Sequence, residues 1–239
     1  MKVSLVLLTW NREFFLRRAV EHNLGNAGYP IEEVIWVDNG STDGTKDYML
    51  NRLSEIKHIS VLRSENGGCG VGYNTAYKLV GDTDIVARPS SYKCMPDNWL
   101  KDFVEWHEAI PEAGIVGMIS TSFKGVLDKR YIGEKIELHG RTIQPANTLG
   151  CIAFKKKILD DGIFLPILEN KYGYEDTIWT EKVRSAGYLN FYINGEVRDF
   201  PEEELKMYPE YVEWKGNECK KFDTFYGELS KELNKHING

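Results

Sequence analysis

Two adjacent carboxylates, Glu175 and Asp176, could carry a proton transfer. They open the segment 174–186, which we expect to form a helix. A carboxylate can take a proton from a hydroxyl when it lies within hydrogen-bonding reach and its surroundings tune its pKa. The helix dipole also favours carboxylates at a helix N-terminus, so capping stays open as the alternative. The pair therefore predicts a general base or a helix cap.

A second polar group follows the strand predicted at residues 31–37. Asp38 can accept hydrogen bonds from a base or a ribose, and the Asn-Gly dipeptide behind it allows the backbone to turn with a positive φ. We expect Ser41 and Asp43 to be structural, and in a plain strand-to-helix turn one or the other would cap the next helix. Asp38 is the residue of this turn that we expect to contact a ligand, with a plain strand-to-helix turn as the alternative.

Four glycines lie within residues 67–72, just before a helix predicted at 71–80. Such a segment lets a phosphate or a nucleoside approach the backbone, with helix N–H groups pointing at the anion. It is not a Walker loop, because no Gly-Lys-Ser/Thr follows. It is not a dinucleotide fingerprint either, because that motif would follow the first strand. Alone, the glycine-rich segment is weak support for a nucleotide site.

The elements that must position these groups alternate between strand and helix. Strand patterns alternating with helices predict an α/β domain, with parallel strands and helices on both faces of an open sheet. In such sheets ligands bind beyond the carboxyl ends of the strands. Asn11 is expected to cap the first helix. The predicted strands of the first half are 3–8, 31–37, 59–62, 85–87 and 115–119.

The second half is less regular. Residues 131–154 suggest strands joined by glycine-containing turns, and 189–193 suggests a further strand. The predicted organisation is a domain over 1–200, with a nucleotide-binding half (1–120) and an acceptor and catalytic half (121–200), followed by a helical extension over 201–239. We expect the apolar stripe of that extension to pack onto the domain. The stripe consists of Phe222, Phe225, Tyr226, Leu229 and Leu233.

Composition excludes several classes. With 239 residues, 42% apolar and 28% charged, the chain is typical of a globular protein, without an apolar run long enough to span a bilayer. The net charge of −6 argues against a protein that grips duplex DNA through phosphates, although the basic run 155–157 leaves a local patch open. Four scattered cysteines and no export signal predict a cytoplasmic protein. No histidine pair has metal-ligand spacing, and His139 is a weak candidate for lining a site.

Taken together, these segments resemble the family 2 glycosyltransferases of the GT-A fold. Residues 3–12 resemble the family's first strand and Thr-x-Asn-Arg turn, and 37–45 match its second-strand motif. Asn-Gly-Gly at 66–68 with Asn74 resembles its third element, and 173–188 its Glu-Asp helix and next strand. The matches follow the family's order over residues 3–198.

The resemblance implies a role for each matched residue. Asp176 would be the base that deprotonates an acceptor hydroxyl, with Glu175 beside it, in a transfer that usually inverts the anomeric centre. Asp38 would bind the base of the nucleotide, typically a uracil-like one, so that a UDP-sugar is the favoured donor. The remaining residues implied to bind the nucleotide are Thr9, Asn11, Arg12, Asn66, Gly67 and Asn74.

One departure concerns the metal. The family places an Asp-x-Asp-like cluster after the fourth strand for Mn²⁺ or Mg²⁺, but residues 87–93 contain no carboxylate. Hard divalent cations need carboxylate oxygens. Arg88 and Lys93, with Ser90 between them, could instead bind the diphosphate, Arg through its fork geometry. We therefore predict metal-independent transfer and no metal ligand, with Mn²⁺ or Mg²⁺ kept as a possible cofactor.

Other functions stay open. A conventional metal-dependent transferase would use Asp82, Asp84 or Asp97 instead. A catalytically inactive domain could serve as a nucleotide-sugar sensor or scaffold, and the missing acidic cluster supports that alternative. A nucleotidyltransferase is disfavoured, because no Gly-x-Gly-Thr-Arg loop follows the first strand. The acceptor could be a glycan, a lipid carrier, a protein or a modified nucleic-acid base.

Overall fold

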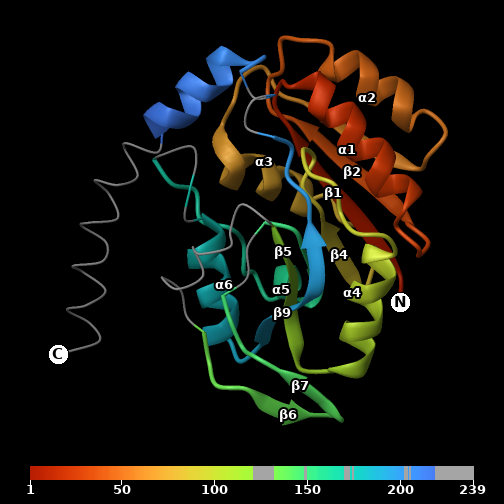
Figure 1. The fold of residues 1–239 in the computed structure, drawn as a ribbon, viewed down its shortest axis with the longest axis vertical. Coiled ribbons are helices and arrows are strands. Elements are labelled where there is room, and N and C mark those ends of the chain that lie inside the picture. Colours follow the sequence, from red (N-terminus) through yellow and green to blue (C-terminus); the bar gives the residue numbers. More distant parts are fainter. Residues whose placement is uncertain are drawn as a thin grey trace.

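A single large sheet organises the chain (Figure 1). The computed structural model describes residues 1–120, 132–147, 150–169, 173, 175–201, 204 and 206–218. Within these residues seven strands form the sheet, in the order β3-β2-β1-β4-β8-β5-β9. The strands are β1 (Val3–Thr9), β2 (Glu33–Asp38), β3 (His58–Leu62), β4 (Ile85–Arg88), β5 (Ala113–Ser120), β8 (Ile152–Lys155) and β9 (Leu189–Val197).

The strand directions confirm a mostly parallel sheet. β1 pairs in parallel with β2 and β4, and β2 pairs in parallel with β3. β8 is antiparallel to both of its neighbours, β4 and β5, and β5 is parallel to β9. The carboxyl ends of β1, β2 and β4 therefore meet at one edge, which is where a ligand site is expected in an α/β sheet.

Helices cover both faces of the sheet and bury two apolar clusters. Leu5 and Leu7 of β1 belong to one cluster and Val6 to the other, because alternate side chains of a strand point to opposite faces. Figure 1 shows α1, α2 and α4 on one side and α3 and α6 on the other. The helices are α1 (Glu13–Gly25), α2 (Thr45–Leu53), α3 (Gly68–Tyr77), α4 (Trp99–Ala109), α5 (Lys157–Asp160) and α6 (Glu175–Ser185).

The start of α1 differs from the prediction that Asn11 caps it. Asn11 and Arg12 both have left-handed backbones, with φ of 53° and 62°, and Arg12 occupies the position before the helix. The Asn11 side chain is turned away from α1, because its Oδ1 accepts a hydrogen bond from the backbone N–H of Thr42 (2.8 Å). The capping prediction is therefore wrong, and the residue instead ties the turn after β1 to the turn after β2.

The glycine-rich segment is helical rather than a loop. The predicted helix was 71–80, whereas α3 begins at Gly68 and takes in most of the glycines. Because glycine has no Cβ, two neighbouring segments can lie very close to this helix. A Cβ at Gly70 would lie 2.4 Å from the backbone oxygen of Pro166, and one at Gly72 would lie 2.4 Å from Leu8. The glycines thus let the start of α3 pack closely against β1 and the segment around Pro166.

A small hairpin, β6 (Ile136–Leu138) with β7 (Arg141–Ile143), accounts for part of the irregular second half. His139 forms its turn with a φ of 50°, and its Nε2 lies 2.9 Å from a carboxylate oxygen of Glu112. Figure 1 shows the hairpin at the far end of the molecule from the start of α3. His139 therefore does not line the predicted site.

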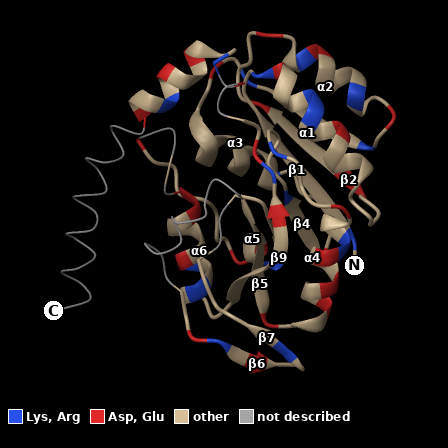
Figure 2. Ribbon diagram, viewed as in Figure 1, with Lys and Arg blue, Asp and Glu red and all other residues tan. Residues whose placement is uncertain are grey.

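Charged residues are interspersed on the helices (Figure 2). In the basic run 155–157, Lys156 and Lys157 form ion pairs with Asp160 and Asp161, at 2.5 and 2.7 Å. Two of the three lysines therefore pair with aspartates four residues later, at the two ends of α5, so they give no support for a nucleic-acid patch.

The chain after β9 returns to the N-terminal half. Residues 209–218 form a helix, and Tyr211 within it is buried. The predicted stripe of Phe222, Phe225, Tyr226, Leu229 and Leu233 lies outside the described residues, and the domain boundaries stay predictions. No helix in the described part of the chain is both long and apolar enough to cross a membrane.

Candidate functional site

Asp38 lies at the end of β2 and is completely buried. Its Oδ1 accepts hydrogen bonds from the hydroxyls of Thr9 (3.0 Å) and Ser41 (2.5 Å), and its Oδ2 accepts one from the backbone N–H of Ser41 (2.8 Å). The Nζ of Lys46 lies 3.9 Å from Oδ2. In this conformation the carboxylate holds two turns together, so its contact with a nucleotide stays a prediction.

Arg12 is enclosed by aromatic rings. Its Cζ lies 3.6 Å from the ring centroid of Tyr92 and 3.7 Å from that of Tyr211 in the helix 209–218. Beside it, the ring centroids of Trp10 and Trp214 lie 4.6 Å apart. The helix 209–218 thus docks onto the turn predicted to line the nucleotide pocket.

The second and third predicted motifs meet through Asn39. Its Nδ2 donates to Oδ1 of Asn66 (2.8 Å), and its Oδ1 accepts from the backbone N–H of Gly67 (3.2 Å). Asn74 acts differently, because its side chain exchanges two hydrogen bonds with the backbone of Leu165, at 2.9 and 3.1 Å. The structure therefore brings Asn66 and Gly67 close to Asp38, and it uses the buried side of α3 to hold the chain around Leu165.

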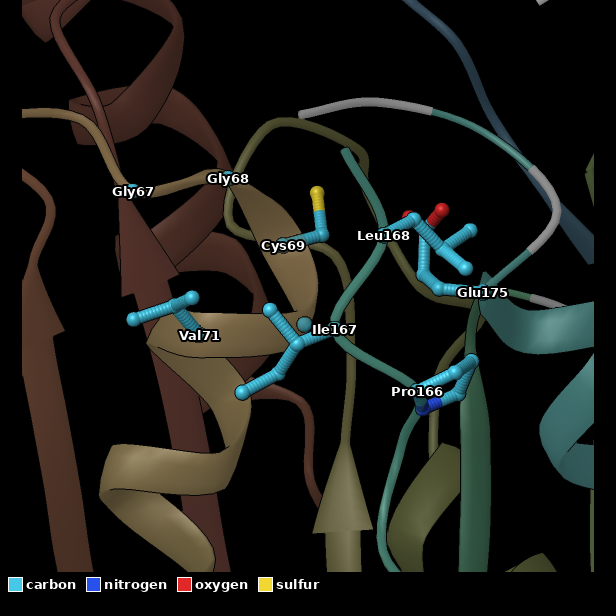
Figure 3. A pocket seen from close by; sticks show the side chains of 9 residues that line it. Gly67, Gly68, Cys69, Val71, Pro166, Ile167, Leu168 and Glu175 are labelled. Atoms are coloured by element: carbon cyan, nitrogen blue, oxygen red, sulfur yellow. The ribbon is translucent and has the colours of Figure 1, made fainter. Parts of the chain in front are cut away.

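A small recess, with room for about one water molecule, opens at the start of α3. Glu175, at the start of α6, closes one side of it (Figure 3). Figure 3 shows the Cys69 thiol and the Glu175 carboxyl pointing to the same side of the recess. The lining residues are Gly67, Gly68, Cys69, Gly70, Val71, Pro166, Ile167, Leu168 and Glu175.

The surroundings of Glu175 favour its neutral form. Burial, together with the adjacent charge of Asp176, raises the pKa of Glu175 from 4.5 to about 7, against a hydrogen bond from Cys69 and the charge of Arg88. Burial also raises the pKa of the Cys69 thiol well above its usual value, and the Glu175 charge adds to that effect. Cys69 is therefore a neutral thiol beside a carboxyl that titrates near neutral pH.

Asp176 forms an ion pair with Arg88, 88 positions earlier in the chain. Nη2 of Arg88 lies 2.6 Å from Oδ1 of Asp176, and the backbone N–H of Gly150 donates to Oδ2 (3.1 Å). The Arg88 guanidinium is 1% exposed and lies 4.5 Å from the ring centroid of Tyr73. The predicted base and the predicted diphosphate ligand are thus bonded to each other.

The two other residues predicted to bind the diphosphate are also engaged. Nζ of Lys93 lies 2.5 Å from a carboxylate oxygen of Asp199 and donates to the hydroxyl of Ser120 (2.7 Å). The hydroxyl of Ser90 accepts from the backbone N–H of Tyr92 (3.2 Å). A diphosphate would have to compete with these partners for both cations, and the predicted role stays untested.

A comparison of the sequence with family models gives a match over residues 4–162, to the family described as glycosyl transferase family 2. The chain belongs to this family. The match begins in β1 and ends just beyond α5, so it covers the turns after β1 and β2 and the start of α3. No curated protein matched the chain.

Solved structures of glycosyltransferases share the fold. A mannosyltransferase from Pyrobaculum calidifontis, PcManGT, solved with GDP-Man and Mn²⁺, is 22% identical, with a TM-score of 0.65 over 84% of this chain and 57% of that chain. TarS 1-349 from S. aureus with UDP-GlcNAc is 20% identical, with a TM-score of 0.62 over 84% of this chain and 59% of that one. The chain therefore spans less than two thirds of either neighbour's length, and its fold is of the GT-A type.

The segment after β4, where the family resemblance implies metal-binding acids, offers a divalent cation no carboxylate ligand in residues 87–93. The segment after β4 offers a buried, paired arginine, two serines and a paired lysine. Among the described residues no group of three or more His, Cys, Asp or Glu side chains could hold a metal. The alternative metal ligands lie elsewhere. Asp82 and Asp84 accept hydrogen bonds from Lys2, at the end of β1 opposite the predicted site. Asp97 precedes Asn98, whose backbone N–H donates to the backbone oxygen of Asn26 after the C-terminus of α1.

Two residues of this site were missed in the sequence. Asn39 was treated as a turn former, although its amide bridges two motifs. Cys69 was treated as one of four scattered thiols, yet it lines the recess beside Glu175. The place of Asn39 between two predicted ligand turns was a usable signal, whereas nothing in the sequence connected Cys69 with residue 175.

Proposed function

We propose that this family 2 member transfers a sugar from a nucleotide-sugar donor to an acceptor hydroxyl, with inversion at the anomeric carbon. The observation that carries the proposal is the meeting of the Glu175–Asp176 pair with the glycine-rich start of α3. A carboxylate that could act as a base lies beside a helix N-terminus of the kind that binds phosphate groups, which supports the proposal.

In this proposal the donor lies over the ends of β1 and β2. The nucleotide would contact the predicted residues Thr9, Asn11, Arg12, Asp38, Asn66 and Gly67, with Asn74 supporting α3 from behind. Neighbours of the same fold were solved with UDP-GlcNAc and with GDP-Man, which supports a nucleotide-sugar donor. UDP-sugars remain our favoured class, and the acceptor class is left to experiment.

The diphosphate leaves with increasing negative charge, which the site must stabilise. We propose that transfer is metal-independent, because the residues after β4 offer no carboxylate ligand. Arg88 and Lys93 would serve the diphosphate only after exchanging their present carboxylate partners for it.

Donor turnover tests these statements. Purified protein is incubated with UDP-GlcNAc, other UDP-sugars and GDP-mannose, and release of the nucleoside diphosphate is measured with EDTA and with added Mn²⁺. We expect turnover that EDTA leaves unchanged. Activity abolished by EDTA and restored by Mn²⁺ would refute metal independence but leave the transfer proposal intact.

An inactive sensor is the second candidate, and the absence of carboxylates after β4 favours it. It predicts nucleotide-sugar binding by calorimetry without any turnover. The anomeric configuration of a transferred sugar, determined by NMR, decides between inversion and retention.

A further inference from the structure

We infer that the helix 209–218 belongs to the donor site, where Tyr211 is a positioning residue for Arg12. Tyr211 and Tyr92 hold the Arg12 guanidinium between their rings, so that its N–H donors can bind a phosphate of the nucleotide. The inference deepens the proposed function and rests on it, because that proposal has Arg12 contacting the nucleotide. It brings in a segment that lies beyond the family match, which ends at residue 162.

The two rings enclose the guanidinium from opposite sides. Cζ of Arg12 lies 3.6 Å from the ring centroid of Tyr92 and 3.7 Å from that of Tyr211. Two rings this close to one carbon would overlap on the same face of a planar group, so each ring covers one face. A guanidinium stacked in this way keeps its N–H donors in its own plane, where they can form a forked pair of hydrogen bonds with a phosphate. The stacking therefore fixes the direction of the donors without using them.

The N–H donors of Arg12 have no protein partner within the part of the chain that the structure describes. There the guanidinium forms neither an ion pair nor a hydrogen bond, and its Nε is buried without a partner. A buried donor without a partner is costly, and a bound anion would supply one. Arg88 and Lys93 differ, because each is already paired with a carboxylate. Arg12 can therefore meet a phosphate without first giving up a partner.

Arg12 also lies near the segment that the proposal gives to the diphosphate. It follows β1, which pairs with β4, so the ends of these two strands are neighbours in the sheet. Tyr92 lies in the segment after β4. Its hydroxyl accepts a hydrogen bond from the backbone N–H of Trp10 (2.6 Å) and donates one to the backbone oxygen of Asn11 (2.9 Å). Tyr92 thus ties the segment after β4 to the turn that carries Arg12.

Contacts on both sides of Tyr211 hold the helix 209–218 on this turn. Tyr211 is 7% exposed, and the ring centroids of Trp214 and Trp10 lie 4.6 Å apart. Just before the helix, the hydroxyl of Tyr208 accepts a hydrogen bond from the backbone N–H of Phe14 (3.0 Å). Because coupling between two binding events is reciprocal, a docked helix that strengthens phosphate binding must itself be stabilised by the bound phosphate.

The test is a double-mutant cycle on the binding of UDP and of GDP, measured by calorimetry. Arg12→Met removes the charge and should weaken binding by about 10–100-fold. Tyr211→Leu removes one ring and should weaken binding by about 3–10-fold. The double variant should bind like Arg12→Met, because Tyr211 acts through Arg12. Two controls should bind like the wild type: Tyr211→Phe, which keeps the ring, and Val212→Ala, at an exposed position of the same helix.

Two further ligands separate a contact with phosphate from a contact with the base. Binding of inorganic pyrophosphate should depend on Arg12 and Tyr211 as binding of UDP does, whereas binding of uridine should depend on neither. Limited proteolysis tests the reciprocal effect. UDP should protect the helix 209–218 in the wild type and should give no protection in Arg12→Met.

The inference is overturned if Tyr211→Leu weakens UDP binding equally in the wild type and in Arg12→Met, because the helix would then support the site without the guanidinium. Unchanged UDP binding in Tyr211→Leu, an equal loss for uridine, or a wild type that binds neither nucleoside diphosphate nor pyrophosphate would also overturn it. A wild type that binds UDP through Arg12 and Tyr211 but turns over no nucleotide sugar would overturn the proposed transfer alone. Pyrophosphate binding through both residues without nucleoside diphosphate binding would overturn the nucleotide-sugar donor and leave the phosphate site standing.

Discussion

Replacing Glu175 with glutamine should change how the stability of the protein depends on pH. The pKa of this carboxyl is about 7 in the folded protein and near 4.5 in the unfolded chain. The folded state therefore binds this proton more tightly than the unfolded chain does, so the free energy of unfolding falls as pH rises between those values. Stability attributable to Glu175 is complete below about pH 4.5 and is lost as pH rises through about 7.

The magnitude follows from the same shift. A difference of one pH unit corresponds to about 1.4 kcal/mol, so the range from 4.5 to about 7 corresponds to roughly 3 kcal/mol as an upper value. Glutamine cannot ionise, so the variant loses this dependence while keeping the shape of the side chain. Between pH 5 and pH 8, the stability of Glu175→Gln relative to the wild type should rise by about 2–3 kcal/mol.

The assay is urea denaturation of both proteins at several pH values, with stability taken from the fitted curves. Taking the difference between the two proteins removes the contributions of all other titrating groups that behave alike in both. Glu181→Gln is the control and should give a difference that does not vary with pH. A flat difference for Glu175→Gln would refute the burial argument for its pKa, whatever its role in catalysis.

Three further changes test the surrounding structure. Asp38→Ala leaves the donors that now bond its carboxylate without a partner and should lower stability by about 1–3 kcal/mol in urea titrations. In Gly70→Ala the new Cβ would lie 2.4 Å from a backbone oxygen, so calorimetry should show weaker nucleotide binding and thermal unfolding a lower Tm. In the control, Gly216→Ala, the new Cβ has no neighbour within 4 Å, and neither property should fall. Tyr211→Ala removes one ring from Arg12 and should make the helix 209–218 more sensitive to proteases, while Val212→Ala at an exposed position should not. Equal protease sensitivity of the two variants would contradict the docking of that helix.

The order of strands and helices in the first half could be predicted because local patterns determine it. Continuous apolar runs such as residues 3–8 can only be buried on both faces, which predicts a sheet covered by helices. The antiparallel insertion of β8 between β4 and β5 could not be predicted in this way. It depends on pairing between distant segments, which leaves no period in the sequence. The left-handed backbone of Asn11 and Arg12 could not be predicted for a related reason. It accompanies a hydrogen bond from Thr42 to the Asn11 side chain, which joins two turns that are distant in the sequence.

The roles of charged residues were harder to predict than their positions. Arg88 was recognised as a cation at the right edge of the sheet, but its partner lies 88 positions away, and only the fold brings the two together. A sequence shows a cation where the family resemblance implies an acid, and it does not show which charge that cation neutralises. Here Arg88, at the end of β4, pairs with Asp176 in the first turn of α6. Glu175, the neighbour of Asp176, is half-buried and lies close to the Asp176 charge, and these two conditions raise the pKa of its carboxyl toward neutral pH.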